Sequence, residues 1–406
     1  MEAPLYKIVN FAAGSYIILE GERKSPQFFI IKDGKVNLKR DFPVLGEKPN
    51  ELLGPGDFFG VIAAMSQYPQ IESAVAITPV TLIGVANYKF GELIQKNSPL
   101  AMKIIRYFSK KLRQFDEPVG TSAGKHAMSS QPSPEANLNI LFNLSEFYFM
   151  QGQISTCIYM LQSYLKYLPD GEFSEKAKSK LEMLGAPIVA EEDESGTTRH
   201  YATDQMIFCE NEPGNDLYIV QKGRIKISKI IQNNDVILNI MKPGDIFGEM
   251  ALLDNKPRSA SAIAMDDDVE LMVINKKNFE VMTKQQPQLM TRIITILSER
   301  IWNAYKKVAN SQLPDLNARI SDMLMTIAER GKAKIGPRAT FDFKITLFEL
   351  LKMLGLTDRD QAGVLKFLSI NKFIKLEGEN LVCSDLALLD RLVHQHREKL
   401  KESRGS

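Results

Sequence analysis

The stretch IFGEMALLDNKPRSASA, Ile246–Ala262, places an acid and a base at the two ends of a short helical turn. Gly248 gives the backbone room to approach a ligand, and the turn after it presents free N–H groups and a positive helix end to an anion. Arg258 supplies a fork-shaped cation and Ser259 a hydroxyl donor for a phosphate, while Glu249 can accept from a sugar hydroxyl. The stretch therefore predicts a binding site for a small ribose phosphate.

A plainer interpretation of the same residues is a surface ion pair between Glu249 and Arg258 that flanks an ordinary β-turn. Most neighbouring acids and bases in a protein chain are of this kind. The preceding residues favour the binding site, because the segment 216–228 alternates apolar and polar residues on both sides of a Lys222-Gly223 turn. That alternation predicts a β-hairpin leading into the helical turn.

The glycine, the glutamate, the Met-Ala-Leu turn and the Pro-Arg-Ser-Ala run stand at the spacing of a known motif. They resemble the phosphate-binding cassette of cyclic-nucleotide-binding domains, as in the catabolite activator family and the regulatory subunit of the cyclic-AMP-dependent kinase. The resemblance implies a β-roll that binds a cyclic nucleotide, and the serine favours cyclic AMP over cyclic GMP. The residues implied to contact the nucleotide in this stretch are Gly248, Glu249, Met250, Ala251, Arg258, Ser259 and Ala260.

Length and composition indicate several domains and a balanced charge. The chain has 406 residues, and 51 basic against 49 acidic side chains leave a net charge of +2, so any nucleic-acid contact must come from a local patch. No apolar run is long enough for a membrane span and the first residues do not resemble a signal peptide, so we expect a soluble, cytoplasmic protein. The three cysteines, Cys157, Cys209 and Cys383, are widely spaced. We therefore expect a reducing compartment and no metal centre in the protein.

The chain contains two copies of one β-rich pattern. Three pairs of segments match between the copies: 18–22 with 208–212, 28–36 with 217–225, and 54–60 with 242–248. The copies differ at the residues expected to bind the ligand: the first has Val61, Gln70 and Ile71 where the second has glutamate, arginine and serine. Without the charged groups the first copy should lose most of its affinity for a charged cyclic nucleotide. We expect it to be a scaffold or dimer-contact domain.

The segment between the copies is helical in pattern and resembles one tetratricopeptide repeat. It departs from that family at Tyr164, where a small residue is usual. A single repeat cannot bury its own faces, so it must pack on a neighbouring domain or on another chain. A structural spacer is one interpretation and a binding site for a protein partner is the other. The residues at repeat positions are Leu141, Leu144, Tyr148, Gly152, Cys157, Leu161, Tyr164 and Pro169.

A long helix is predicted after the second copy, over residues 287–310. Its apolar residues recur close to a/d spacing, and in the resembling families this helix pairs with its copy in a second chain. The same resemblance places Asn303, Ala304 and Tyr305 nearest the nucleotide base. Trp302, the only tryptophan, is their neighbour.

The last part of the chain predicts a DNA-binding domain. Thr346 and Glu349 form a capping-box pattern at the start of one helix, Thr357 precedes a second helix over 358–370, and two strands follow around a tight turn. The order resembles the winged helix-turn-helix of the catabolite activator family. The residues implied to contact DNA are Thr357, Arg359, Gln361 and Lys366.

The expected fold class is multidomain α+β, with two β-roll (jelly-roll-like) domains, an α-helical hairpin between them and a C-terminal winged helix-turn-helix. The expected order of parts is a degenerate cyclic-nucleotide-binding domain (1–115), a linker (116–134), a tetratricopeptide-like helical segment (135–186), a second linker (187–199), a cyclic-nucleotide-binding domain (200–286), a dimerisation helix (287–313) and a winged helix-turn-helix domain with a C-terminal helix (314–406).

These features predict a homodimeric transcription regulator that responds to cyclic AMP as a regulatory ligand and binds double-stranded DNA. The histidines have no companion nucleophile, so no enzyme activity is expected. An alternative is a cyclic-nucleotide-sensing adaptor in which the winged helix binds protein. A kinase-inhibiting regulatory subunit is disfavoured, because the stretch 116–137 has no paired arginines for a pseudosubstrate.

Overall fold

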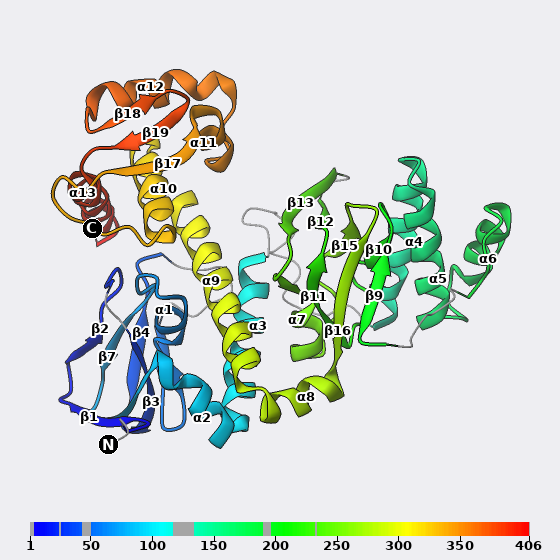
Figure 1. Cartoon of the computed structure of the whole chain (residues 1–406), viewed down its shortest axis with the longest axis horizontal. Helices are drawn as coiled ribbons and strands as arrows, with labels where there is room; N and C mark the ends of the chain where they lie inside the picture. The colour runs from blue at the N-terminus through cyan, green and yellow to red at the C-terminus, as the bar shows by residue number, and fades with distance from the viewer. Residues whose placement is uncertain are drawn as a thin grey trace. The chain divides into compact units, whose positions relative to one another are not determined.

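The computed structural model describes residues 4–23, 26–42, 50–116, 134–189, 196–231 and 234–405. These residues form two compact units (Figure 1). Unit 1 contains residues 1–90, 114–116 and 297–406, and unit 2 contains residues 91–113 and 117–296. Most of the two predicted linkers, residues 117–133 and 190–195, lies outside the described residues.

The first β-roll, in unit 1, consists of two four-stranded antiparallel sheets. One sheet has the order β1 (Lys7–Phe11), β8 (Val80–Ala86), β3 (Gln27–Asp33) and β6 (Phe58–Phe59); the other has the order β2 (Tyr16–Ile18), β7 (Ser73–Ala76), β4 (Val36–Lys39) and β5 (Asn50–Leu53). The inward side chains of both sheets form one apolar core that includes Ile31, Val36 and Leu82. A short helix, α1 (Val61–Ser66), follows β6.

The second β-roll, in unit 2, repeats this topology strand for strand. One sheet has the order β9 (Thr198–Tyr201), β16 (Val269–Asn275), β11 (Asp216–Lys222) and β14 (Ile246–Phe247); the other has the order β10 (Met206–Phe208), β15 (Ser261–Ala264), β12 (Ile225–Ile231) and β13 (Asn234–Met241). Its core includes Tyr218, Phe247 and Leu271. The strand orders confirm that the two sequence copies share one fold.

The predicted hairpin over residues 216–228 is wrong. Its two strands are present, but β11 pairs with β14 and β16 whereas β12 pairs with β13 and β15. The turn at Gly223, with φ of +78°, therefore carries the chain from one sheet to the other. Alternating polarity identifies a half-buried strand but does not identify the strand beside it.

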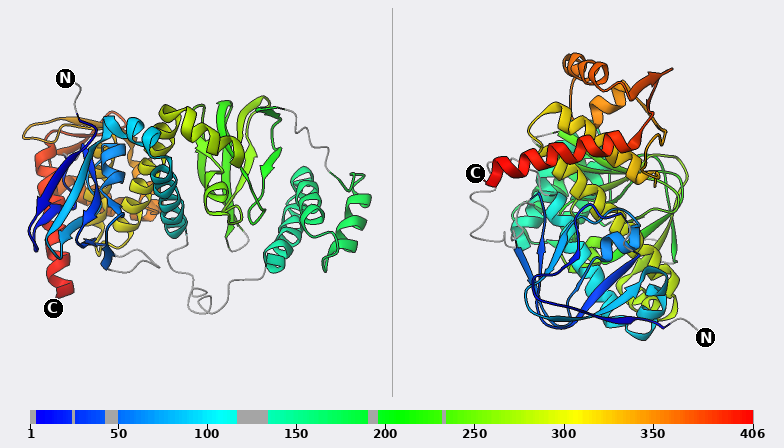
Figure 2. Two further views of the ribbon diagram at one scale, coloured as in Figure 1. Left: turned by 90° about the horizontal axis from the view of Figure 1, so that it is seen from below. Right: turned by 90° about the vertical axis from the view of Figure 1, so that its left-hand side faces the viewer.

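The helical segment packs on the second β-roll within unit 2 (Figure 2). Its helices are α4 (Pro134–Met150), α5 (Ile154–Tyr167) and α6 (Ser174–Met183). Their core, which includes Leu161 and Leu181, is shared with Met206 and Cys209 of the β-roll. The prediction that a lone helical hairpin must pack on a neighbour is confirmed.

Helical segments follow each β-roll: α2 (Phe90–Lys96) and α3 (Ser98–Asp116) after the first, and α8 (Lys276–Gln285) and α9 (Pro287–Ser311) after the second. The apolar stripe of α9, including Ile293, Leu297 and Ile301, is buried within the single chain. Homodimerisation stays a prediction.

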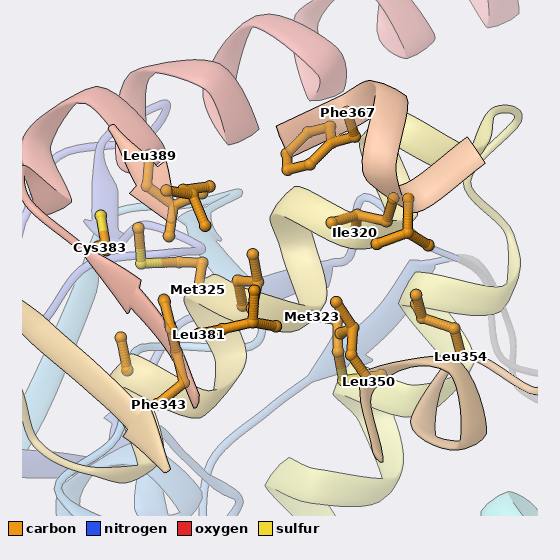
Figure 3. Close-up of a cluster of buried hydrophobic side chains, with 14 of the residues drawn as sticks. Ile320, Met323, Met325, Phe343, Leu350, Leu354, Phe367, Leu381, Cys383 and Leu389 are labelled. Atoms are coloured by element: carbon orange, nitrogen blue, oxygen red, sulfur yellow. The ribbon is translucent and has the colours of Figure 1, made fainter. Parts of the chain in front are cut away.

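The C-terminal part of unit 1 combines four helices with a three-stranded antiparallel sheet of order β17-β19-β18. Its elements are α10 (Leu316–Arg330), β17 (Phe341–Thr346), α11 (Leu347–Met353), α12 (Gln361–Ile370), β18 (Ile374–Glu377), β19 (Asn380–Cys383) and α13 (Leu386–Gly405). Ile320, Phe343, Leu350, Phe367 and Leu389 meet in one core (Figure 3).

Two of the predicted helices, α11 and α12, begin after a threonine that the sequence identifies as a capping residue. The capping box of Thr346 and Glu349 is confirmed, with both reciprocal hydrogen bonds present. The second helix begins later than predicted: residues 358–360 form a 3₁₀ turn, and α12 starts at Gln361. Thr357 donates its amide and hydroxyl to the Asp360 carboxylate, so the Asp360 side chain closes the turn before the helix.

Among the described residues, none of the helices has the length and apolarity to cross a membrane.

Candidate functional site: a nucleotide cassette and its altered copy

Gly248 starts the short helix that carries Glu249, α7 (Glu249–Asp254). Its φ of +76° is left-handed, and a Cβ there would lie 2.8 Å from Arg258 Nη1 and 3.1 Å from the Tyr218 ring. Both the conformation and these contacts exclude a side chain. Glycine therefore lets the guanidinium lie against the start of α7.

Arg258 lies inside the domain with its guanidinium over the Phe208 ring, 4.1 Å from the ring centroid. Its Nη1 donates to the carbonyl oxygens of Gly248 at 2.6 Å and Asp216 at 2.8 Å. Its Nε is buried and has no hydrogen-bond partner among the described residues. The site thus holds a buried cation with an unused donor, a costly arrangement unless an anion completes it.

The remaining cassette residues lie around this cation. Glu249 is only 1% exposed and Arg258 5%, so the interpretation of a surface ion pair is wrong. Met250, Ala251 and Ala260 are buried as well. The Ser259 hydroxyl is half-buried, and the contact described for it is with the Met250 sulfur at 3.8 Å.

The backbone of Arg258 is held by the turn that follows β10. The Arg258 amide donates to the Glu212 carbonyl at 2.8 Å, and the Asn211 amide donates to the Arg258 carbonyl at 2.9 Å. The Glu212 side chain is buried beside them and accepts from the Cys209 amide at 2.9 Å. Burial raises the pKa of Glu212, an effect that the Cys209 amide and the charge of Arg258 oppose.

Helix α3 contacts the cassette in unit 2. Ser109 Oγ donates to the carbonyl oxygen of Met250 at 3.3 Å, and Arg113 Nη2 donates to that of Pro257 at 3.0 Å. The helix that follows the first β-roll therefore supports the cassette of the second one. Sequence reasoning missed both residues, because no local pattern shows which distant segment a helix contacts.

The first β-roll has the same cassette backbone as the second but lacks its charged and hydroxyl side chains. Gly60 has φ of +76°, like Gly248, and the Gln70 amide nitrogen would lie 3.7 Å from a Cβ there. Gln70 also makes the same two main-chain bonds, to Gly21 and Glu22, at 2.8 and 2.9 Å. Val61 and Ile71 are buried apolar side chains. A neutral amide thus occupies the place of the cation.

Side chains of unit 1 contact the residues around this altered cassette. Trp302 Nε1 donates to the Pro69 carbonyl at 3.0 Å, and the Trp302 ring packs on Tyr68 with centroids 4.6 Å apart. The Tyr305 hydroxyl donates to Glu20 at 2.8 Å. Burial is the largest cause that raises the pKa of Glu20, to about 7.

Two residues predicted at the nucleotide base therefore have other described contacts. Tyr305 engages Glu20, and the Asn303 amide donates to the Glu299 carbonyl of its own helix at 2.8 Å. Both residues belong to unit 1, whereas the cassette belongs to unit 2. Their role at the base stays a prediction without a contact to support it.

The C-terminal part of unit 1 is bound to the first β-roll by ion pairs. Arg23, in the turn after β2, pairs with Glu329 of α10 at 3.3 Å and with Asp390 of α13 at 2.6 Å. Glu329 also pairs with Lys306 of α9 at 3.0 Å, with both side chains buried. The altered cassette and this network together hold the C-terminal helices on the first β-roll.

The predicted DNA contacts Thr357, Arg359, Gln361 and Lys366 are all exposed, at and after the turn that precedes α12. The same helix exposes apolar side chains, with Leu365 44% and Ile370 64% exposed. The four predicted residues are therefore exposed along the turn before α12 and the first six residues of that helix, which also exposes apolar residues that sequence reasoning did not single out.

Residues 8–97 and 198–286 match the family model of the cyclic nucleotide-binding domain, which confirms the duplication. A CRP-like cAMP-activated global transcriptional regulator of Mycobacterium tuberculosis is 25% identical over 186 residues, covering 46% of this chain and 83% of that protein. The chain is thus similar to regulators of the catabolite activator type.

Two solved structures are among those similar to parts of the chain. The Thermus thermophilus catabolite activator protein is 24% identical, over 49% of this chain and 90% of that chain, with a TM-score of 0.28. The regulatory domain of Toxoplasma gondii PKA with cAMP is 15% identical, over 71% of this chain and 85% of that chain, with a TM-score of 0.21.

Proposed function

We propose that the second β-roll binds cyclic AMP and that the chain is a cytoplasmic DNA-binding transcription regulator without catalytic activity. The observation that carries the proposal is the buried Arg258, whose Nε has no partner among the described residues, at the start of α7 in a region that matches the cyclic nucleotide-binding model. A cyclic phosphate satisfies that donor and neutralises the charge. Ser259 supplies a hydroxyl to the same phosphate, and Glu249 accepts from the ribose.

The base preference follows from Ser259. Cyclic-GMP-selective relatives of this cassette carry threonine there, so we propose cyclic AMP as the ligand. Displacement of labelled cyclic AMP by the two nucleotides tests this preference. Cyclic GMP that competes at equal or lower concentration contradicts it.

The C-terminal part of unit 1 is proposed to be a winged helix in which the end of α12 enters the major groove of DNA. Arg359 is the charged donor nearest the start of that helix, and Lys366 supplies a phosphate contact. Two chains in a homodimer would present two such helices to a two-fold operator. Cyclic AMP acts by favouring one arrangement of the helices over another.

A second candidate function is a cyclic-AMP-dependent adaptor that binds protein through the same helix. The exposed Leu365 and Ile370 on α12 favour it, because apolar side chains gain little against phosphates. Electrophoretic mobility shifts with genomic fragments at low salt, with and without cyclic AMP, separate the two. Retarded fragments support the regulator, and no retardation of any fragment supports the adaptor.

The binding proposal is tested by equilibrium dialysis of labelled cyclic AMP against the full chain. The wild type is expected to bind and Arg258→Ala to lose binding. Equal binding by both proteins would remove Arg258 from the site and the proposal with it.

A further inference from the structure

We propose that Tyr159, on α5 of the helical segment, is a positioning residue for Arg258, so that this segment is part of the nucleotide sensor. The inference rests on the proposed function of the second β-roll. It replaces the interpretation of the segment as a spacer.

Tyr159 contacts the β-roll at two places beside the cassette. Its hydroxyl lies 3.2 Å from the Ile207 carbonyl oxygen, and 3.3 and 3.1 Å from the two carboxylate oxygens of Glu212. Burial and the neighbouring Glu212 hold the pKa of Tyr159 well above its usual value, so the phenol keeps its proton and donates. A single hydroxyl therefore links α5 to a strand and to the turn that follows it.

Both residues that the Tyr159 hydroxyl contacts, Ile207 and Glu212, are next to or bonded to groups that contact Arg258. Ile207 precedes Phe208, whose ring lies under the guanidinium at 4.1 Å. Glu212 accepts the Arg258 amide on its carbonyl at 2.8 Å. Tyr159 thus fixes the ring beneath the cation and the backbone that carries it. A shift of either would change where the free Nε points, and charge-assisted hydrogen bonds depend steeply on that direction.

The first β-roll shows which part of this arrangement belongs to the fold. There the turn at Gly21 and Glu22 makes the same main-chain bridge to Gln70. Glu22, however, is exposed, whereas its equivalent Glu212 is buried against Tyr159. The bridge is therefore common to both copies, whereas a buried carboxylate bonded to a tyrosine at the bridging residue itself is found in the second copy. In the first copy the carboxylate that pairs with a tyrosine stands two residues earlier, at Glu20, and its partner is Tyr305 of α9.

The helical segment is well placed for this role because its core continues into the β-roll. Met206 and Cys209, on either side of the Ile207-Phe208 pair, pack into the cluster of α4, α5 and α6. The segment cannot move away from the β-roll without exposing that shared core. The Tyr159 hydroxyl adds polar contacts, with Ile207 and Glu212, to this apolar interface.

The test compares two tyrosine-to-phenylalanine variants of the same helix. Tyr159→Phe removes the hydroxyl that contacts the β-roll. Tyr164→Phe removes a buried hydroxyl whose partners, Asn139 and the Phe173 amide, lie in the helical segment itself. Cyclic AMP affinity of the full chain is measured by calorimetry, and thermal unfolding is recorded for both. Tyr159→Phe is expected to weaken affinity about fivefold to tenfold, and Tyr164→Phe to leave it unchanged.

A double-mutant cycle with Arg258→Lys separates positioning from general stability. Tyr159→Phe should cost much less affinity in the Arg258→Lys background than in the wild type, because a lysine has no fork to align. Equal losses in both backgrounds, an unchanged affinity of Tyr159→Phe, or an equal loss in Tyr164→Phe would overturn the inference. If Tyr159→Phe does not fold, Glu212→Gln carries the test, since it weakens the acceptor and keeps Tyr159.

The wild-type titration distinguishes this failure from failure of the proposed function. If the wild type binds cyclic AMP and Arg258→Ala does not, the binding site stands and only the role of Tyr159 is in question. If the wild type does not bind, both are overturned.

Discussion

The two β-rolls have the same strand order, the same left-handed glycine before a short helix and the same main-chain bridge to that helix's loop. They differ in the side chain of the residue that the bridge holds: Arg258 of the second copy is a buried cation, and Gln70 of the first is a neutral amide. The backbone of the cassette is thus a property of the fold. Ligand chemistry depends on a few side chains and can be lost while the fold persists.

The helices extend this comparison. In unit 1 the first cassette contacts Trp302 of the helix that follows the second β-roll, and in unit 2 the second cassette contacts Ser109 of the helix that follows the first. Each cassette is supported by the helix of the other copy.

The largest expected effect comes from the tryptophan beside the silent cassette. Trp302→Ala should lower the free energy of unfolding by about 3–5 kcal/mol, since the ring is fully buried and its N–H is bonded to Pro69. Urea unfolding measures it, with Asn303→Ala on the same helix as a control expected within about 0.5 kcal/mol of the wild type. A loss as small as the control's would show that the first copy does not depend on α9.

The active copy is tested by removing its cation. Arg258→Ala should cost about 2–4 kcal/mol of cyclic AMP affinity, the scale for truncating a buried charge-assisted partner. Gln70→Ala, the same truncation in the first copy, is the matched control and should leave the affinity unchanged. An equal loss in both variants would contradict the division between an active and a silent copy.

A smaller effect is expected at the proposed DNA surface, whose helices contact the first β-roll. Arg359→Ala should cost about 1–3 kcal/mol at a specific DNA site, whereas Lys366→Ala should weaken all sequences alike and lower the salt dependence of binding. Fluorescence anisotropy with specific and random duplexes measures both. Loss of specificity in Lys366→Ala instead would exchange the proposed roles.

The last effect concerns the pH dependence of stability in the first copy. Burial raises the pKa of Glu20 to about 7 from a usual 4.5, so the unfolded chain ionises this group before the folded chain does. Its contribution to stability is therefore full at pH below 4.5 and is lost as the pH rises toward 7. Urea unfolding across this range should show a weaker decline in Glu20→Gln than in the wild type. Parallel pH profiles of the two proteins would mean that Glu20 ionises normally in the folded chain.

The sequence supported local features better than distant ones. The cassette, the duplication and the capping box of Thr346 depend on neighbouring residues and were predicted. The hairpin at Gly223 was wrong because strand pairing is decided by distant segments. Tyr159 and Trp302 gave no signal of their contacts for the same reason, although a lone tryptophan in a duplicated chain is a reason to look for one.

The central claim is that one copy of the β-roll binds cyclic AMP and the other does not. Isothermal titration of the full chain with cyclic AMP tests it most directly. One nucleotide per chain is expected, with the heat of binding lost in Arg258→Ala. Two nucleotides per chain, or one nucleotide that remains bound with unchanged affinity in Arg258→Ala, would contradict it.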